Sequence, residues 1–285
     1  MKTTSYFIFS IPVVLLLFAL GCIAYIDAGR EPAFSKITLG GEPSTLQIAD
    51  CTPSAVALSV FEKSSRRHIV DTLCVDIRTD TSLTAPVIEA GSEFFDNIKA
   101  TVSSDTLQLT FELNREKMSP EQYKRLNKIC FASPVSVVLP ANVAVIDARG
   151  SSARIDIAGM RSDYLECRGN FDQTFMFDNC RLGDLVLLKK GYVNDMTAWL
   201  AGTTVSNMQI AVDNKCTLNI DGDAASSVTS VAIEPLPLAE QGDSNGYGYI
   251  NVGLGSLRFS SLSNRHYARV NITFDKEFRA GFSAE

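Results

Sequence analysis

The pattern of apolar and polar positions divides the chain into one continuous apolar run and a long series of short alternating segments. Residues 6–26 contain no charged side chain, and a helix of that length can cross a bilayer, which needs about 20 residues. Behind this run, segments in which every second residue is apolar return repeatedly, and most end at Gly, Asn or Asp. The pattern predicts a membrane-associated segment followed by an all-β region.

Three interpretations of the apolar run remain open. It is an uncleaved transmembrane anchor behind a cytoplasmic N-terminus at residues 1–5, or a cleavable secretory signal in which Lys2 forms the basic region. In the third interpretation it is a lipoprotein signal with lipid attached to Cys22, because the preceding small residue, Gly21, matches part of a lipobox. We expect the anchor, with the C-terminal domain exported to the periplasm or the cell surface.

The region after the linker at residues 27–36 is predicted to contain strands and a single helix. In residues 37–134 the alternation predicts strands at 45–49, 55–61 and 69–77 and a hairpin of 98–102 with 106–113. Ser119, Pro120 and Gln122 have the spacing of a capping box, which predicts a short helix at 120–129.

Residues 135–275 are predicted to form stacked coils, followed by a tail at 276–285. Their apolar positions recur every ten residues at Val145, Ile155, Leu165, Phe175 and Leu185. A constant period of this kind indicates stacked units. An antiparallel sandwich is the alternative, and mainly parallel pairing between successive segments would distinguish the coils from it.

Alternation within these segments predicts which side chains point into the core. We expect Leu165, Ile210 and Leu218 to point inward and Gln209 and Asn219 to point outward. Gly and Asn at segment ends, such as Asn179 and Gly202, suit turns through left-handed conformations.

The charge balance argues against nucleic acid as a partner. Removing Lys2 from the 26 Lys and Arg residues leaves 25 against 32 Asp and Glu, so the part after residue 26 has a formal charge of about −7. A nucleic-acid-binding domain would instead carry a basic stripe. A net negative charge also does not favour binding to anionic lipid headgroups, so membrane attachment is assigned to residues 6–26.

The cysteines allow disulfides but do not predict a metal site. An oxidising compartment would permit bridges among the six that follow Cys22, namely Cys51, Cys74, Cys130, Cys167, Cys180 and Cys216. The alternative is that they are small buried residues of the core. No pair has CxxC spacing and only two histidines are present, so we predict no metal and no cofactor.

Several segments resemble the exported bacterial family named auto-transporter adhesin, head GIN domain. The resemblance covers residues 37–259 and lies in NIKATVSSDTLQLTFEL, VSVVLPANVAVIDARGSS, YLECRGN and MQIAVDNKCTLNIDG. It implies a right-handed parallel β-helix or β-roll-like solenoid at the envelope of a Gram-negative cell, with no established activity. Only ARGSS at 148–152 and NIDGD at 219–223 echo the family's Gly-Ser-Gly-Asp turn.

Two sets of candidate site residues follow. The loop residues Asp243, Asn245, Tyr247 and Tyr249 combine flexible turn residues with two tyrosines, which supply contact area in interfaces. They predict a module that acts by binding or scaffolding, as in adhesion, on an unidentified envelope or extracellular protein or glycan. The alternative is a polysaccharide lyase or hydrolase that uses carboxylates on one coil face.

For that alternative, the candidate catalytic residues are Asp147 and Asp156, which alternate with Arg149 and Arg154 along successive segments. The sequence contains no GxSxG, HExxH or phosphate-binding loop, and it offers few histidines as general bases. We therefore expect no catalysis.

Overall fold

The structure is a computed structural model whose described residues all lie in one compact unit, residues 41–285. The described ranges are 44–48, 51–62, 73–90, 98–113, 135–170, 172–191, 195–213, 215–237, 249–266 and 269–274. The predicted apolar span at 6–26, helix at 120–129 and tail at 276–285 lie outside these ranges. Within the ranges, no helix has the length and apolar character needed to span a membrane.

The prediction of an all-β domain is confirmed, since the described residues form nineteen strands in two sheets and no helix. In spatial order, sheet A consists of β1 (Ser44–Gln47), β4 (Val87–Ala90), β7 (Val135–Leu139), β3 (Leu73–Thr79), β9 (Ala153–Ala158), β11 (Gln173–Asp178), β13 (Asp195–Ala201), β15 (Cys216–Gly222), β17 (Tyr249–Gly253) and β19 (Arg269–Thr273). Sheet B consists of β18 (Phe259–Asn264), β16 (Ser227–Pro235), β14 (Thr204–Val212), β12 (Arg181–Lys189), β10 (Arg161–Gly169), β8 (Val145–Gly150), β2 (Ala55–Glu62), β6 (Thr106–Leu113) and β5 (Ile98–Ser103).

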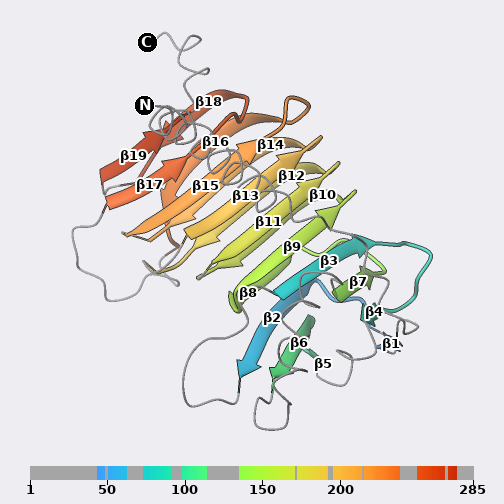
Figure 1. Ribbon diagram of the computed structural model, residues 1–285. Helices are drawn as coiled ribbons and strands as arrows, with labels where there is room; N and C mark the ends of the chain where they lie inside the picture. Colours follow the sequence, from blue (N-terminus) through green and yellow to red (C-terminus); the bar gives the residue numbers. More distant parts are fainter. Residues whose placement is uncertain are drawn as a thin grey trace, which may run out of the picture. The chain divides into compact units, whose positions relative to one another are not determined.

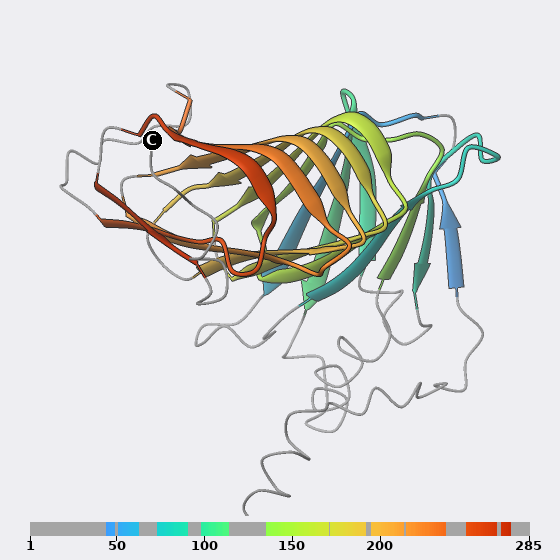
Figure 2. The same cartoon turned by 90° about the horizontal axis from the view of Figure 1, so that it is seen from above.

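From β8 onward the chain passes from one sheet to the other after every strand, so each successive pair of strands makes one coil (Figure 1). Each strand pairs in parallel with the strand one coil later, for example β10 with β12 and β11 with β13. The two sheets form two layers that face each other (Figure 2). This parallel pairing is the feature that distinguishes stacked coils from an antiparallel sandwich.

The ten-residue period in the sequence corresponds to half a coil. Equivalent positions in adjacent coils are 20 residues apart at Asn251 and Asn271 and 23 residues apart at Asp184 and Asn207. Successive members of the ten-residue series, such as Ile155 and Leu165, therefore lie on opposite sheets and point toward each other into one core.

The predicted inward and outward positions are confirmed by burial. Leu165, Ile210 and Leu218 are fully buried, whereas Gln209 is half-buried and Asn219 is exposed. Val145, the first member of the ten-residue series, departs from the other members by one residue: it is half-buried and aligns with the outward Glu166, while its neighbour Ile146 is buried. The alternation slips just before β8, because Val143 and Ile146 are three residues apart and both are buried.

The first coils are stacked out of sequence order. In sheet B, β2 lies between β6 and β8, and in sheet A, β3 lies between β7 and β9, with parallel pairing throughout. In Figure 1 the blue strand β2 accordingly lies between the green strands β6 and β8. After β1 at the edge of sheet A, the chain places β2 and β3 inside the stack, adds β4 to β7 on one side of them, and then continues on their other side with β8 and β9.

The end of the stack formed by β1 and β5 differs from the coiled part in strand direction. β5 and β6 form the predicted hairpin, in which Ser104 adopts a positive φ of 59° at the turn. β4 pairs antiparallel with both β1 and β7. These antiparallel strands end the regular parallel stacking on both sheets.

The turns from sheet A to sheet B form one edge of the coils, here called the A-to-B edge. Asn179 and Gly202 turn there through φ values of 52° and 55°, as predicted for Asn and Gly at segment ends. Behind them, the backbone N–H of Cys180 donates to Thr203 Oγ1 at 3.1 Å, and that of Thr203 donates to Ser226 Oγ at 3.1 Å. Each buried hydroxyl also donates to a carbonyl, Thr203 to Phe177 and Ser226 to Leu200. This hydroxyl ladder satisfies backbone groups that burial would otherwise leave without a partner.

The three-disulfide arrangement allowed by the sequence is not formed. The five cysteines in the described ranges, Cys51, Cys74, Cys167, Cys180 and Cys216, are free thiols, and Cys130 lies outside those ranges. Cys167 occupies an inward position of β10, and Cys180 Sγ lies 3.3 Å from the Ile157 carbonyl oxygen. These two residues therefore act as small buried side chains of the coils.

Candidate binding site

The structure describes only one residue of the predicted contact loop. Tyr249 begins β17 with 68% of its surface exposed, and the guanidinium carbon of Arg269 lies 5.8 Å from the centre of its ring. Asp243, Asn245 and Tyr247 lie outside the described residues. The cation–π contact shows how one tyrosine is held, while the loop itself stays a prediction.

The candidate catalytic pair is separated between the two sheets. Asp147 lies on β8 of sheet B and Asp156 on β9 of sheet A. Both point away from the core, because their neighbours Ile146 and Ile155 are fully buried in it. Since the outer faces of two facing sheets point in opposite directions, the structure does not bring Asp147 and Asp156 together.

Each of these carboxylates is paired with an arginine on its own strand. Asp147 Oδ2 lies 2.6 Å from Arg149 Nη2, with side chains 22% and 25% exposed. Burial acts to raise the pKa of Asp147, but the hydrogen bonds and positive charge of Arg149 outweigh it, so this pKa is lowered. Asp156 Oδ1 accepts a hydrogen bond from Arg154 Nε at 2.9 Å. The lowered pKa keeps Asp147 ionised rather than ready to donate a proton, and the Asp156 carboxylate is likewise engaged by an arginine.

Asp156 has a different acidic neighbour that sequence reasoning did not identify. Asp76 on β3 stands directly opposite Asp156 in the parallel register of β3 and β9. Burial raises the pKa of Asp76, and the negative charge of Asp156 adds to this effect while Arg78 opposes it. No local sequence signal marks this pair, because β3 reaches β9 only through the out-of-order first coils.

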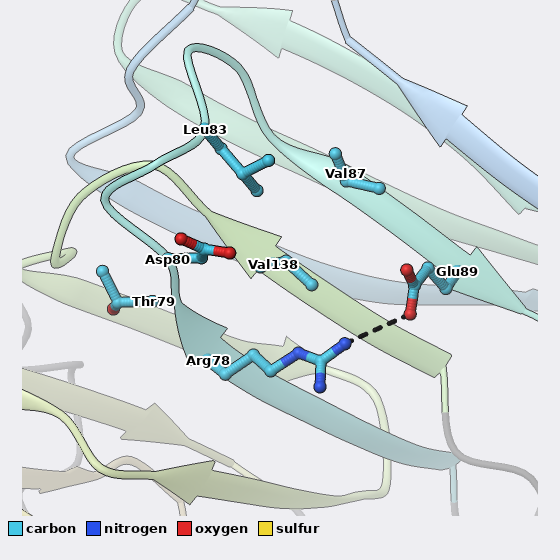
Figure 3. A pocket seen from close by; sticks show the side chains of 7 residues that line it. All are labelled: Arg78, Thr79, Asp80, Leu83, Val87, Glu89 and Val138. Carbon is cyan, nitrogen blue, oxygen red and sulfur yellow. Dashed lines mark hydrogen bonds and ion pairs between the residues drawn. The ribbon is translucent and has the colours of Figure 1, made fainter.

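A cavity of about 400 Å³ lies on the outer face of sheet A near these residues (Figure 3). Its charged groups are already engaged: Arg78 Nη2 lies 3.2 Å from Glu89 Oε2, and Asp80 Oδ1 accepts hydrogen bonds from the Ser82 N–H and hydroxyl. Figure 3 shows Arg78 extending toward Glu89 across the cavity. A ligand here would have to break an ion pair before it could use either charge.

A wider groove of about 730 Å³ lies on sheet B next to the A-to-B edge, at the starts of β10, β12 and β14. Its lining includes Arg161, Asp163, Tyr164, Arg181, Gly183, Thr204 and Ser206 and the turn residues Asn142 to Ala144. We call this feature the strand-start groove. At this groove the inward–outward alternation of the strands shifts by one residue. Leu182 and Leu185 are three residues apart and both buried, and the same holds for Val205 and Met208.

The first residues of these strands form a row of unpaired polar groups. Arg161, Arg181 and Thr204 stand side by side in the parallel register, and all three are exposed. Within the described part of the chain, neither guanidinium group belongs to an ion pair. Like charges in adjacent positions of a sheet repel each other, so the two arginines lie close together at a cost in stability.

The next outward row along the same strands is paired within itself. Asp184 Oδ1 accepts a hydrogen bond from Asn207 Nδ2 at 2.8 Å, and Asn207 Oδ1 accepts one from the Ser230 hydroxyl at 2.8 Å. The contrast with Arg161 and Arg181 shows that the sheet can pair its outer side chains where the sequence supplies partners. The strand-start row is therefore a part of sheet B with charge available to a ligand.

Tyr164 places an aromatic ring in the lining of the same groove, three residues along β10 from Arg161. Its side chain is 40% exposed, and its hydroxyl donates to Glu166 Oε2 at 2.8 Å. Burial and the Glu166 carboxylate raise the pKa of Tyr164 to about 12, so the hydroxyl stays protonated and the hydrogen bond persists at physiological pH. The bond fixes the ring at the groove rather than leaving it free to rotate.

Gly183 is required where β12 closely approaches β10 within the groove lining. A Cβ atom at this position would lie 2.5 Å from the Asp163 carbonyl oxygen on the adjacent strand, which is closer than real Cβ contacts allow. Any larger residue would push β10 and β12 apart. The glycine therefore maintains the close approach of the strands that carry Arg161 and Arg181.

A buried lysine lies at the opposite edge of sheet B and was not identified from the sequence. Lys189 ends β12 at an inward position with no exposed surface, and its Nζ donates to the Asn170 carbonyl oxygen at 2.8 Å. Burial lowers the pKa of Lys189, while nearby Cys216 and Asp172 act to raise it. Its burial separates it from the strand-start groove, and its contact is with the turn that follows β10.

Comparison with known proteins does not assign the chain to a family. No family model matches it, so membership of the adhesin family named above stays a prediction, and no curated protein matches its sequence. Three crystal structures, each named "putative adhesin", resemble it. The one from Bacteroides fragilis is 12% identical and covers 81% of this chain and 97% of its own, with a TM-score of 0.44. The one from Parabacteroides distasonis is 10% identical and covers 82% of this chain and 97% of its own, with a TM-score of 0.45. The one from Parabacteroides merdae is 11% identical and covers 82% of this chain and 96% of its own, with a TM-score of 0.36.

Proposed function

We propose that the chain is an exported binding module of the bacterial envelope that acts without turning over its partner. In this proposal residues 6–26 tether it to the membrane and the coils form a right-handed β-solenoid in the periplasm or at the cell surface. The uncharged 21-residue run supports the tether. The parallel stacking of two facing sheets supports the solenoid, which presents a long rigid face to a partner.

The observation that carries the proposal is that some charged side chains are already paired with each other, whereas others are exposed and available to a ligand. The carboxylates Asp147 and Asp156 are each bonded to an arginine, whereas Arg161 and Arg181 are exposed and, among the described residues, unpaired in an open groove. Binding needs accessible groups of fixed geometry. Acid–base catalysis needs a proton donor and acceptor that converge on one substrate, and Asp147 and Asp156 lie on opposite faces.

Binding by the full chain tests this proposal. Cells that display the chain should adhere to envelope or extracellular material more strongly than cells that display the Arg161→Gln, Arg181→Gln double variant. Equal adherence by both, at matched surface levels, would contradict a role for the groove. Release of sugars or peptides from the bound material would contradict action without turnover.

Labelling with a lipid precursor tests how the chain is tethered. The anchor predicts no lipid on the mature protein and an intact N-terminus. Incorporation of label that is abolished in Cys22→Ser would instead identify a lipoprotein. An N-terminus that begins after residue 26 would identify a cleaved signal.

A carbohydrate-active enzyme is the second candidate, and one specific observation favours it. Asp76 and Asp156 stand opposite each other, with the pKa of Asp76 raised by burial and Asp156 bonded to Arg154, which is the division between acid and base that glycoside hydrolysis uses. Turnover of a polysaccharide that is lost in Asp156→Asn or Asp76→Asn would establish this function. Turnover lost in Asp147→Asn would place the chemistry on sheet B instead.

A further inference from the structure

The strand-start groove has the chemistry of a site for a negatively charged ligand. Arg161 and Arg181 are neighbours across a parallel pair, where strands are about 4.8 Å apart. Two guanidinium groups at this spacing repel each other, and an anionic group bound between them would remove that repulsion. Arginine also binds carboxylate and sulfate groups through two parallel hydrogen bonds.

The groups around the arginines favour a sugar over a peptide or a free anion. The ring of Tyr164 is fixed at the groove and offers an apolar face that suits the C–H face of a pyranose ring. Thr204 and Ser206 place exposed hydroxyl groups on the other side of Arg181, where they can exchange hydrogen bonds with sugar hydroxyls. A peptide strand would instead need an unpaired sheet edge, and β12 is paired on both sides from Arg181 onward. β8 pairs with β10 only from Glu166, but beside the start of β10 the Asn142 side chain already donates a hydrogen bond to the Arg161 carbonyl oxygen.

Acidic residues limit the strength of the site: Glu166 and Asp184 lie near Tyr164, and Asp163 lies in the groove lining. Asp163 lines the same groove and is exposed, so it offsets part of the positive charge of Arg161 and Arg181. The chain as a whole has a formal charge of −6 and repels polyanions at long range, but salt screens this repulsion beyond about 8 Å at physiological ionic strength. The local charge of the groove therefore decides which ligand binds.

We propose that the strand-start groove binds an acidic glycan, with a sugar carboxylate or sulfate held between Arg161 and Arg181 and a sugar ring on Tyr164. This proposal rests on the binding function proposed above and names the class of its ligand. Uronate and sulfate groups share the required chemistry, so the test contains one polymer of each kind. Neutral sugars can use the ring and the hydroxyls but not the arginines.

The test measures binding of the full chain in detergent to immobilised polygalacturonate, heparin and dextran. The wild-type chain should bind at least one acidic polymer, bind dextran at least about tenfold more weakly, and lose affinity as salt rises. Arg161→Gln and Arg181→Gln should each weaken acidic binding roughly tenfold to a hundredfold. Asp163→Asn should strengthen it, because it removes the opposing charge.

Matched variants separate the groove from general effects. Tyr164→Ala should weaken binding, whereas Tyr164→Phe keeps the ring and should retain most of it. Arg258→Gln removes an exposed arginine beyond the groove lining and should leave binding unchanged. Thermal melting of each variant shows whether a loss of binding reflects unfolding instead.

The outcomes distinguish this proposal from the one it rests on. Acidic binding that is lost with Arg161 and Arg181 and increased with Asp163→Asn supports the acidic glycan. A chain that binds neither acidic polymer, although cells displaying it still adhere through the groove arginines, overturns the ligand class and leaves the binding module intact. Equal loss in Arg258→Gln, or unchanged binding in the Arg161 and Arg181 variants, overturns the site.

Discussion

The outer faces of the two sheets use their charged side chains differently. On sheet A, Arg154 bonds Asp156 and Arg78 bonds Glu89, so the charges satisfy each other. On sheet B, the middle of the strands follows the same pattern, with Arg168 Nε 2.6 Å from Glu166 Oε1. The starts of its strands do not, because Arg161 and Arg181 have no acidic partner among the described residues. The same repeated strands thus carry one surface on which the charged side chains pair with each other. At the strand starts of sheet B, a few residues away, they carry charged side chains that remain available to a ligand.

The largest expected effect tests whether both faces really enclose one core. Ile210→Lys buries an unpaired charge and should lower the free energy of unfolding by about 3 to 5 kcal/mol. Gln209→Lys and Asn219→Lys, at outward positions, should change it by less than about 0.5 kcal/mol. Denaturant unfolding measures all three. Equal losses at inward and outward sites would overturn the register on which the comparison depends.

The next effect concerns the hydroxyl ladder that supports the strand-start row. Thr203→Val removes the acceptor of the buried Cys180 N–H and should cost about 1 to 3 kcal/mol. Thr203→Ser keeps the hydroxyl and should cost clearly less. Chemical denaturation of the pair measures the difference. If valine were as stable as serine, the ladder would not hold this edge in place.

The acidic residues of the two faces should respond to pH in opposite directions. The pKa of Asp147 is lowered on folding, so its stabilising contribution is present above its ordinary value near 3.8 and is lost as pH falls through the lower folded value. The pKa of Asp76 is raised, so its contribution is present below that ordinary value and is lost as pH rises through the higher folded value. At neutral pH, Asp147→Asn should therefore destabilise the chain and Asp76→Asn should not.

Melting curves between about pH 3 and 7 measure this difference, which is on the order of 1 kcal/mol. The loss caused by Asp147→Asn should shrink as the pH is lowered below about 4. If the stabilities of Asp147→Asn and Asp76→Asn depended on pH in the same way, the carboxylates of the two outer faces would not differ in pKa as described.

The smallest effect is expected at the cavity on sheet A. Arg78 and Glu89 are 50% and 37% exposed, and exposed ion pairs contribute about 0 to 1 kcal/mol. Arg78→Ala should therefore change the free energy of unfolding by less than about 0.5 kcal/mol. Arg149→Ala, which breaks a less exposed pair, should cost more, and urea unfolding of the two variants compares them. The reverse order would contradict the ranking by exposure.

The sequence was sufficient to predict the features that depend on neighbouring residues. Alternation placed Leu165, Ile210 and Leu218 in the core, and the Ser-Ser-Asp turn located the hairpin of β5 and β6. The ten-residue series does not mark the inward position at Val145, where the alternation slips by one residue before β8. Because Val145 and Ile146 are both apolar, either of them could occupy the inward position, and the residue types alone do not reveal the slip.

The features that depend on which coils lie side by side could not be predicted. The pair of Asp76 and Asp156 exists because β3 is inserted between β7 and β9, and no local pattern specifies that insertion. The groove likewise depends on the register that aligns Arg161 with Arg181 and on Gly183, whose role is visible only when Asp163 is placed against it. The predicted catalytic pair, Asp147 and Asp156, failed to converge for a different reason: the successive strands β8 and β9 belong to opposite sheets.

Hydrogen–deuterium exchange of the full chain, with and without polygalacturonate, tests most directly whether sheet B rather than sheet A carries the ligand. Binding at the strand-start groove predicts slower exchange at the turns and strand starts around residues 161–164, 181–184 and 204–207. It predicts no change around residues 76–80 and 154–156. Slower exchange confined to residues 76–80 and 154–156 of sheet A, or spread equally over both sheets, would contradict binding at the strand-start groove.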